Sequence, residues 1–167
     1  MAFSVKNWTN RMTTRLNAAA MEDLEERLSD YTDSVAAGGI ELGNSQITAD
    51  ATRNATSYAD VAGLSTTVTV GARPIEVIFS CGASSNNGAS GGLSVAILED
   101  GSQIGGASHI FTNASNGVPI YRRLRRAPSA GSHTYKVQLK TLLAGTATLT
   151  ADSGSVVGPA SISVVEI

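Results

Sequence analysis

From residue 40 to the last residue, short apolar or alternating segments follow one another, separated by glycine, proline, asparagine and aspartate. Alternation is clearest in YKVQLK at 135–140, where every second residue is apolar. Such a segment buries one face and exposes the other when it forms a β-strand. The pattern predicts about eight to ten short strands with turns every 8–12 residues, which is typical of an antiparallel β-sandwich, jelly roll or barrel.

Nine segments are expected to form strands, and the denser ones suit central positions in a sheet. They are SQITAD, LSTTVTVG, RPIEVIFSCGA, GGLSVAILED, SQIGGASHI, GVPIYRRLRRA, HTYKVQLKTL, GTATLTAD and ASISVVEI. Glu99-Asp100-Gly101 predicts a tight hairpin, and Pro128 to Gly131 predicts a second turn. The segment SCGASSNNGASGG, at 80–92, predicts a long, flexible and exposed loop.

The composition agrees with a strand-rich fold. Hydrophobic residues make up 42% of the 167 residues, aromatic residues 5% and charged residues 16%. Small residues and threonine fill the remainder, which favours short strands and tight turns over helix bundles. A surface this poor in charge also indicates burial of part of the chain in an assembly.

The segment 14–39 predicts the one helix of the chain. Thr14 or Asn17 fits the N-cap position, and Gly38-Gly39 fits the C-terminal end. Its apolar residues recur in steps of three and four, as in a coiled-coil seam: Met21, Leu24, Leu28, Tyr31 and Val35. A lone helix packed on its own sheet would give a similar periodicity. The apolar stripe is narrow, however, so self-association is favoured.

Residues 1–13 form a short arm in which Phe3, Val5 and Trp8 are spaced as in an extended segment. Trp8 is the only tryptophan of the chain. Two interpretations stay open for it. The arm folds back on its own helix, or Trp8 anchors the chain in a partner, since tryptophan is enriched among interface hot spots.

The charge and hydropathy of the chain exclude several partner classes. The formal net charge is −2, whereas a general nucleic-acid binder needs a broad basic face. No window approaches the roughly 18 apolar residues of a membrane span. The first residues, MAFSVKNWTNR, lack the features of a secretory signal. We expect a protein made in a cytoplasm, with no nucleic-acid partner and no membrane insertion.

Few residues carry catalytic or metal-binding chemistry. Cys81 is the single cysteine, so the sequence predicts an inert buried thiol and neither a disulfide nor a thiolate zinc site. His109 and His133 have no neighbouring acids or histidines, and His133 is expected to make local hydrogen bonds at a strand start. No nucleophile elbow, phosphate loop or dinucleotide fingerprint occurs. The sequence therefore predicts no enzyme activity, no cofactor and no metal.

The one unusual cluster is YRRLRR at 121–126. In a strand, Tyr121, Arg123 and Arg125 share one face, and Arg122 and Arg126 share the other with Leu124. Three interpretations stay open. The arginines lie on an edge strand, where charge discourages pairing with another sheet; they lie between subunits, paired with Glu76 or Glu99 of a neighbour; or they bind an anionic polymer such as an acidic cell-wall glycan.

Both ends of the chain resemble small structural proteins of tailed bacteriophages. Such proteins open with T-x-L-N-A-A-x-φ-x-x-φ-E-x-R, where φ is apolar. The matching residues here are Thr14, Leu16, Asn17, Ala18, Ala19, Met21, Leu24, Glu25 and Arg27. The segments AGSHTYKVQLK, GTATLTAD and PASISVVEI are similar to the closing strands of phage fibre heads of the tumour-necrosis-factor/C1q-like jelly-roll type.

The resemblance implies a homotrimeric, non-enzymatic virion structural protein: a fibre, a decoration protein or a minor tail protein. Residues 1–13 would dock on capsid or tail proteins, 14–39 would form a short trimeric coiled coil, and 40–167 would form a jelly-roll head on the virion surface. The alternative is a receptor-binding tail tip or adhesin that recognises a host cell-wall glycan. The chain has no internal repeat, so a compact decoration is as attractive as a tail tip.

Overall fold

The computed structural model describes residues 39–88, 90–111, 117–151 and 158–167. Within these residues the regular secondary structure consists of ten β-strands. They are β1 (Ile40–Gln46), β2 (Ala51–Arg53), β3 (Ala59–Val70), β4 (Ile75–Asn86), β5 (Gly91–Glu99), β6 (Ser102–Ile110), β7 (Val118–Arg126), β8 (Gly131–Leu143), β9 (Ala147–Leu149) and β10 (Ser161–Glu166). The predicted arm at 1–13 and the predicted helix at 14–39 lie outside the described residues, except for Gly39.

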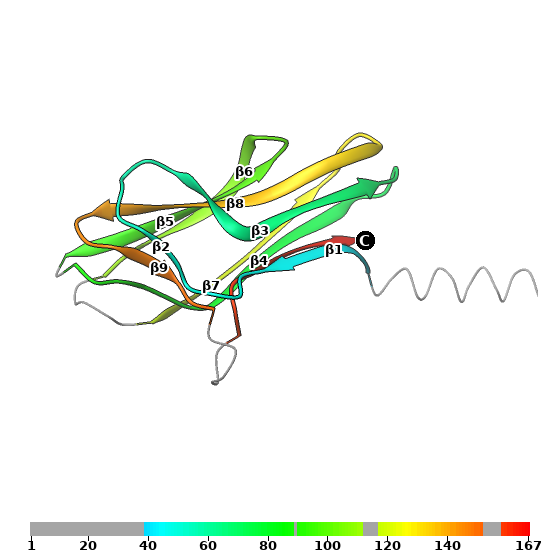
Figure 1. The fold of residues 1–167 in the computed structure, drawn as a ribbon. Helices are drawn as coiled ribbons and strands as arrows, with labels where there is room; N and C mark the ends of the chain where they lie inside the picture. The colour runs from blue at the N-terminus through cyan, green and yellow to red at the C-terminus, as the bar shows by residue number, and fades with distance from the viewer. Residues whose placement is uncertain (1–38, 89, 112–116, 152–157) are drawn as a thin grey trace, which may run out of the picture. The chain divides into compact units, whose positions relative to one another are not determined.

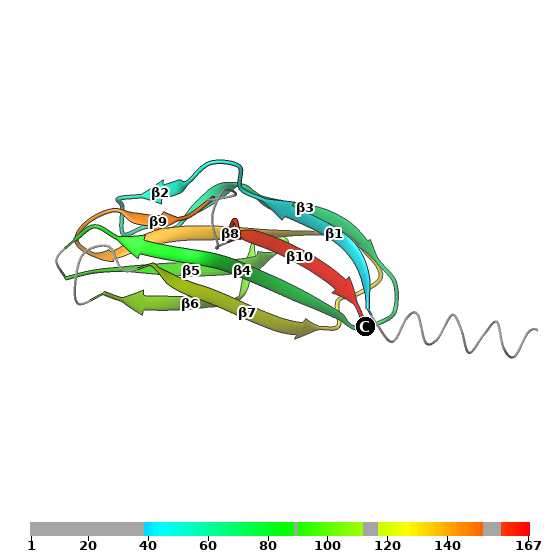
Figure 2. The ribbon, with the colours of Figure 1, turned by 90° about the horizontal axis from the view of Figure 1, so that it is seen from below.

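The strands form two antiparallel sheets that face each other as a sandwich (Figure 1). In the six-stranded sheet, β4 pairs on one side with β7 and on the other with β10 and then β9. β10 also pairs with β1, and β9 with β2. This sheet therefore has four rows, in the order β1/β2, β10/β9, β4 and β7 (Figure 2). The second sheet has the order β3, β8, β5 and β6.

The sandwich has two lateral edges, which Figure 2 shows at the top and the bottom. At the first, the row β1/β2 lies against β3; we call it the β1–β3 edge. At the second, β7 lies beside β6; we call it the β7 edge. The two edges are separated by the two inner strands of each sheet.

Alternate side chains of the inner strands fill the space between the sheets. On β8, Tyr135, Val137 and Leu139 are at most 2% exposed, which confirms the alternation predicted at 135–140. On β4, Ile75, Val77 and Phe79 are fully buried. β4 and β5 occupy inner positions in their sheets, as the density of apolar residues in their segments predicted. The prediction of an antiparallel β-sandwich is thus confirmed for residues 40–167 where they are described.

The predicted hairpin after β5 is also present. Asp100 and Gly101 both have positive φ angles, of 49° and 83°, as the two central residues of a type I′ turn require. Aspartate tolerates this left-handed region and glycine adopts it freely. The second predicted turn, Pro128 to Gly131, connects β7 in one sheet to β8 in the other, so it crosses the sandwich.

The prediction of a flexible loop at 80–92 is wrong. Residues up to Asn86 continue β4, and β5 begins at Gly91. Ser84 and Asn86 are fully buried. The Asn86 side chain donates hydrogen bonds to the Gly92 carbonyl (2.8 Å) and to Thr141 Oγ1 (2.9 Å). Residues of β5 and β8 thus satisfy the Asn86 amide, which allows this polar segment to be buried. The local sequence does not indicate that these residues lie next to Asn86.

The predicted strand SQITAD, at 45–50, is wrong beyond its first two residues. β1 ends at Gln46, and Ile47 to Asp50 lead into the short β2. Ile47 is 3% exposed and its amide donates to the Ala160 carbonyl (3.0 Å). The chain thus changes partner between β1 and β2, from β10 to β9.

Candidate functional site

The predicted arginine cluster lies on β7, which pairs only with β4 among the described strands. Ile120 is buried and Leu124 packs against the core, so alternation places Arg122 and Arg126 on the inward side of the strand. Tyr121, Arg123 and Arg125 then lie on the outer face of the sheet. The edge position that the first interpretation requires is therefore met.

Two of the four arginines are paired with acids of their own chain. Arg123 bonds Glu76 on β4, and Arg126 Nη2 donates to Glu99 Oε2 on β5 at 2.7 Å. The Tyr135 hydroxyl donates to the other oxygen of Glu99, also at 2.7 Å. Glu76 and Glu99 thus already have arginine partners in a single chain, and neither requires a neighbour, contrary to the partners suggested for a subunit contact.

Three side chains of the cluster keep their polar groups exposed. Tyr121 is 63% exposed, and Arg122 and Arg125 are exposed as well. Neither arginine has an ion pair in the described part of the chain. An exposed guanidinium with five donors binds carboxylate or phosphate oxygens in a bidentate manner. This part of β7 is therefore a candidate contact surface for an anionic group.

A second polar cluster lies where the β5–β6 turn approaches the start of β8. His133 Nδ1 lies 2.7 Å from Asp100 Oδ2, and His133 Nε2 lies 2.9 Å from the Ser129 carbonyl oxygen. The Thr134 amide donates to Asp100 Oδ1 at 2.8 Å. The local hydrogen-bonding role predicted for His133 is confirmed. These groups border an open cavity of about 600 Å³ that Glu99, Gln103 and Arg126 also line.

The pKa values in this cluster move in opposite directions. The Ser129 carbonyl, and then the Asp100 carboxylate, raise the pKa of His133 above its ordinary value of 6.5, because an imidazolium donates to both. The Thr134 amide, and then His133, lower the pKa of Asp100. Burial, followed by the hydrogen bond to Glu99, raises the pKa of Tyr135. The cluster thus favours the ion pair and keeps the phenol neutral.

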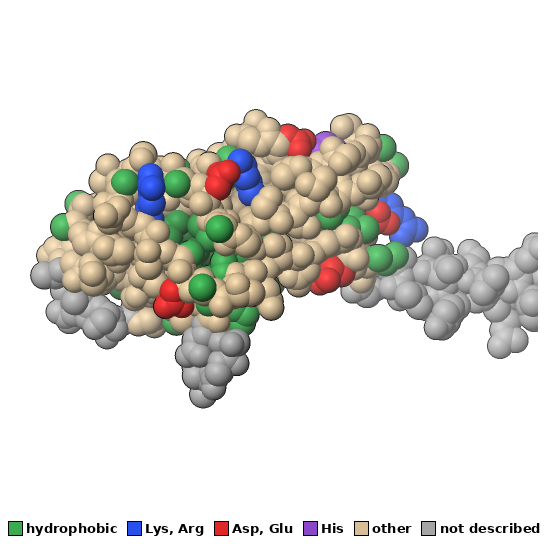
Figure 3. Space-filling model, in the orientation of Figure 1, with side chains coloured by type: hydrophobic (Ala, Val, Ile, Leu, Met, Phe, Trp, Pro, Cys, Tyr) green, Lys and Arg blue, Asp and Glu red, His purple; other side chains and the backbone are tan. Residues whose placement is uncertain are grey.

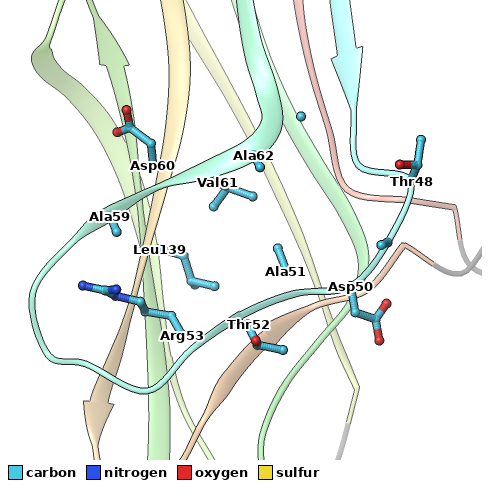
Figure 4. A pocket seen from close by; sticks show the side chains of 12 residues that line it. Thr48, Asp50, Ala51, Thr52, Arg53, Ala59, Asp60, Val61, Ala62 and Leu139 are labelled. Atoms are coloured by element: carbon cyan, nitrogen blue, oxygen red, sulfur yellow. The ribbon is translucent and has the colours of Figure 1, made fainter.

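A cavity of about 480 Å³, which we call the edge cavity, opens at the β1–β3 edge. Figure 4 shows Ala51, Val61 and Leu139 facing one another across it, while Arg53 and Asp60 lie at its rim. Figure 3 looks onto this edge and shows hydrophobic side chains in the hollow, with both acidic and basic groups around it. Asp50 and Thr48 complete the rim from the β1–β2 connection. The walls are made of small side chains, which leaves room for an inserted group.

The cavity forms where both strand rows of the edge are irregular. β1 and β2 are separate strands in one row, and the pairing of β3 with β8 shifts between Asp60 and Ser65. Gly63 within this bulge has a φ of 84°, and a β-carbon added there would lie 3.2 Å from the Gln46 carbonyl oxygen. Sequence reasoning missed the cavity. The glycine in the strand segment was the available signal, because glycine inside a strand often marks a bulge.

The outer face of the second sheet carries a row of hydroxyl groups that the sequence did not reveal. The Tyr58 hydroxyl lies 2.7 Å from Ser94 Oγ, which lies 2.7 Å from Ser108 Oγ. The Lys140 ammonium lies 4.5 Å from the centre of the Tyr58 ring. Tyr58 comes from the connection before β3, so this row ties that connection to β5 and β6. The row stabilises the sheet, with the Tyr58 hydroxyl at one end and Ser108 Oγ at the other.

The remaining predicted residues divide into two groups. Cys81 is 2% exposed, its thiol donates to the Ala83 carbonyl (3.0 Å), and burial raises its pKa, so the inert thiol is confirmed. The arm residues Phe3, Val5 and Trp8 and the coiled-coil residues Met21, Leu24, Leu28, Tyr31 and Val35 lie outside the described residues.

Residues 39–88, 90–111, 117–151 and 158–167 contain no group of three or more histidine, cysteine, aspartate or glutamate side chains arranged to hold a metal ion. Within the same ranges, no helix has the length and apolar character to cross a bilayer.

No family model matches the chain, and no curated protein matches it. Among solved structures, it is similar to dimeric latent PorU from Porphyromonas gingivalis, at 13% identity and a TM-score of 0.35, over 77% of this chain and 13% of that chain. It is also similar to the carbohydrate-binding module CBM36 in complex with calcium and xylotriose, at 19% identity and a TM-score of 0.31, over 77% of this chain and 97% of that one. At these TM-scores neither likeness carries an argument about this chain.

Proposed function

We propose that the chain is a non-enzymatic virion structural protein of a tailed bacteriophage, a homotrimeric fibre or decoration protein. In this proposal residues 1–13 anchor the protein to the capsid or tail and residues 14–39 form the coiled-coil stalk. Residues 40–167 form the head displayed on the virion surface. The resemblance of both chain ends to phage structural proteins motivates the proposal.

The observation that carries the proposal is the order of the strands. Counting β1/β2 as the first row in the chain and β9/β10 as the eighth, the two sheets have the orders 1-8-3-6 and 2-7-4-5. This is the strand order of an eight-stranded jelly roll, an architecture used by viral capsid proteins and by lectins. It supports the tumour-necrosis-factor/C1q-like jelly roll that the C-terminal segments suggested. A fold does not fix a function, so the virion role needs its own test.

The oligomeric state is tested by light scattering coupled to size exclusion. The expected mass is three times that of the 17.1 kDa chain. A short coiled coil suffices for this, because the head domains raise the effective concentration of the three helical segments. A monomer at micromolar concentration would contradict the proposal.

The location on the virion is tested by imaging purified particles with and without the protein. Deletion of residues 1–13 is expected to leave trimers intact and to abolish their incorporation into particles. Normal incorporation of the deletion variant would contradict an anchoring arm.

Adhesion to an anionic glycan of the host envelope is the second candidate function. The observation that favours it is the exposure of Tyr121, Arg122 and Arg125 on one strand. Binding to host cells should then weaken with added salt, because exposed charges are screened. If Arg122→Ala with Arg125→Ala leaves binding to host cells unchanged, this candidate is wrong.

A further inference from the structure

The edge strands of the two sheets differ in how they are protected from pairing with another strand. An edge strand exposes unpaired amide and carbonyl groups, and proteins protect such strands with charge, proline, bulges or interruptions. The row β1/β2 is interrupted, β3 is irregular after Asp60, and β7 carries four arginines. β6 is different, because Ser102–Ile110 contains no proline and no aspartate, glutamate, lysine or arginine. β6 is therefore the edge strand with the least protection.

The second half of β6 presents a regular row of backbone groups on its open side. Among the described strands β6 pairs only with β5, and the register shift of this pair lies near the start of β6. The Phe111 amide donates to the Gly91 carbonyl opposite it at 2.8 Å, which fixes the alternation of the ladder. Backbone groups that face the neighbouring strand alternate with groups that face away in an antiparallel pair. The amides and carbonyls of Gly106, Ser108 and Ile110 therefore point away from β5.

β7 lies beside β6 in the other sheet and adds positive charge to this side of the sandwich (Figure 2). Leu124 of β7 lies against Gly105, where an added β-carbon would collide with it. Arg122 comes two residues before Leu124 on the same inward face of β7, so its side chain is directed toward the sheet of β6 as well. Arg122 is exposed and has no ion pair within the described ranges. Neither strand contains an aspartate or a glutamate.

A strand added to β6 would meet both the backbone row and the charge. Its residues opposite Gly106, Ser108 and Ile110 would exchange backbone hydrogen bonds with β6, with their side chains on the outer face of the sheet. Ile110 is 70% exposed on that face. The alternate residues of the added strand, such as the one opposite Ala107, would direct their side chains inward, to the side from which Arg122 approaches. Carboxylates at these alternate positions would meet a guanidinium that has no partner in the described part of the chain.

We propose that β6 is the docking strand for an extended, acidic peptide segment of a partner protein, which adds a strand to the edge of the second sheet. The backbone of β6 supplies the pairing, and Arg122 selects carboxylates at alternate positions of the segment. The inference goes beyond the proposed function and does not depend on the homotrimer. A second copy of the chain fits this edge less well, because an antiparallel pair of β6 strands would bring the β7 strands of both copies together, with arginine against arginine.

The test titrates the full-length protein with a capped heptapeptide of alternating threonine and glutamate, and follows the NMR signals of the β6 amides. Saturable shifts at Gly106, Ser108 and Ile110 are expected. The same peptide N-methylated at its threonines should bind about tenfold more weakly, because the threonine amides would pair with β6 when the glutamates face inward. The matched control is N-methylated at its glutamates, whose amides would point away from β6, and it should bind like the unmodified peptide. A peptide of threonine and lysine should bind more weakly than the glutamate peptide.

A substitution on β6 gives a second readout with the unmodified peptide. Ser108→Pro removes one amide of the open side and none of the bonds to β5, and proline is tolerated on an edge strand where the lost N–H faces solvent. The variant should bind the glutamate peptide about tenfold more weakly. The control Ser108→Ala loses the same hydroxyl contact with Ser94, at 2.7 Å, but keeps the amide, so its affinity should stay that of the wild type. Equal affinities of the two variants would overturn the docking.

The role of charge is tested on the two arginines of β7 that have no ion pair in the described part of the chain. Arg122→Gln should weaken binding of the glutamate peptide about two- to fivefold at low salt, because an exposed ion pair is lost. Arg125→Gln is the matched control, since Arg125 lies on the outer face of the other sheet, and it should leave the affinity unchanged. Equal losses in the two variants would show general attraction to a basic surface and overturn the docking.

The remaining outcomes separate this inference from its alternatives and from the proposed function. Equal binding of the two N-methylated peptides, or of the lysine peptide and the glutamate peptide, overturns the docking. A mass that rises beyond the trimer with concentration in the wild type, but not in Ser108→Pro, shows that a second copy occupies β6 and overturns it as well. A trimeric protein that binds no peptide overturns the docking alone. A monomeric protein that binds the glutamate peptide as expected supports the docking and overturns the homotrimer.

Discussion

The two edges of the sandwich differ in the feature that discourages pairing with a strand of another chain. The β7 edge is a continuous strand of nine residues that carries four arginines. The β1–β3 edge is interrupted: β1 and β2 are separated by Ile47 to Asp50, and β3 has an irregular stretch between Asp60 and Ser65. Both devices, charge in one case and interruption in the other, prevent an edge from pairing with a foreign strand.

The difference has a consequence for packing. Along the β7 edge Leu124 packs against the core, and the open cavity of about 600 Å³ lies where Arg126 ends the strand. An interrupted edge leaves side chains such as Val61 and Leu139 beneath an opening. The cavity of the interrupted edge therefore has apolar walls that include Val61 and Leu139, whereas the cavity beside the β7 edge is lined mostly by polar and charged side chains. Each of the following experiments changes one edge and compares it with the other.

The largest effect is expected for Leu139→Ala, under the β1–β3 edge. Leu139 is 2% exposed and forms the floor of the edge cavity. The substitution should cost about 2–5 kcal/mol of unfolding free energy, because it removes buried methyl groups and enlarges a cavity. Leu124→Ala, under the β7 edge, should cost about 1–2 kcal/mol, since this side chain is only half-buried. Urea denaturation followed by circular dichroism measures both, and equal losses would contradict the difference between the edges.

The next effect is expected for Glu99→Gln, beside the β7 edge. The side chain of Glu99 is 12% exposed and accepts hydrogen bonds from Arg126 and Tyr135. The variant should lose about 1–3 kcal/mol, because Arg126 keeps its charge without a carboxylate partner. The matched control is Glu166→Gln on β10, whose partner Arg73 is 3.9 Å away and exposed. A loss as large in the control would show that the Glu99 cluster has no special role.

A pH-dependent effect is expected where β8 begins, next to the β7 edge. The folded-state pKa of His133 is raised above 6.5, so its stabilising contribution is present below pH 6.5 and is lost as the pH rises through the raised pKa. The pKa of Asp100 is lowered, so its contribution is present above pH 3.8 and is lost as the pH falls through the lowered value. The contribution of the pair is therefore greatest between these limits.

Urea denaturation at about pH 5.5 and about pH 8.5 measures the change in unfolding free energy of the wild type and of His133→Gln. An NMR titration of the His133 ring measures its pKa directly. We expect the wild type to lose stability between the two values by more than the variant does. A His133 pKa at or below 6.5 would refute the two-sided hydrogen bonding described here.

The smallest effect is expected for Asp60→Asn, at the rim of the edge cavity. Asp60 Oδ2 accepts from Lys136 and Oδ1 from Gln138, both at 2.7 Å. Its side chain is 55% exposed, so solvent screens the pair and the cost should be about 0.2–1 kcal/mol. The difference from the wild type should shrink in high salt. A loss above that range would show that the interrupted edge depends on charge as much as the β7 edge does.

Local patterns predicted the parts of the fold that depend on neighbouring residues. The alternation on β8, the Asp100-Gly101 turn and the buried Cys81 each follow from a few adjacent residues, and the structure confirms them. The edge position of β7 agrees with one interpretation of its arginines.

The parts that were missed depend on residues far apart in the chain. Asn86 was assigned to a loop because its segment is polar, but Gly92 and Thr141 satisfy its amide. The pairing of Arg123 with Glu76 and of Arg126 with Glu99 spans 47 and 27 residues. The edge cavity requires the break after β1 and the bulge in β3 to meet in space. A local sequence pattern cannot predict these contacts, because they form only when strands that are far apart in the sequence assemble into sheets.

The position of β10 has a consequence for how this domain forms during synthesis. β10 pairs with both β1 and β4, and Ile40 lies opposite Glu166 at a separation of 126 residues. β1 therefore has no neighbour in the sheet until β10 has left the ribosome. Chains rich in such distant pairings fold slowly, on a timescale of about milliseconds to seconds. A nascent chain that ends before residue 161 should remain sensitive to protease along its β region, and release of β10 should protect it in a single step.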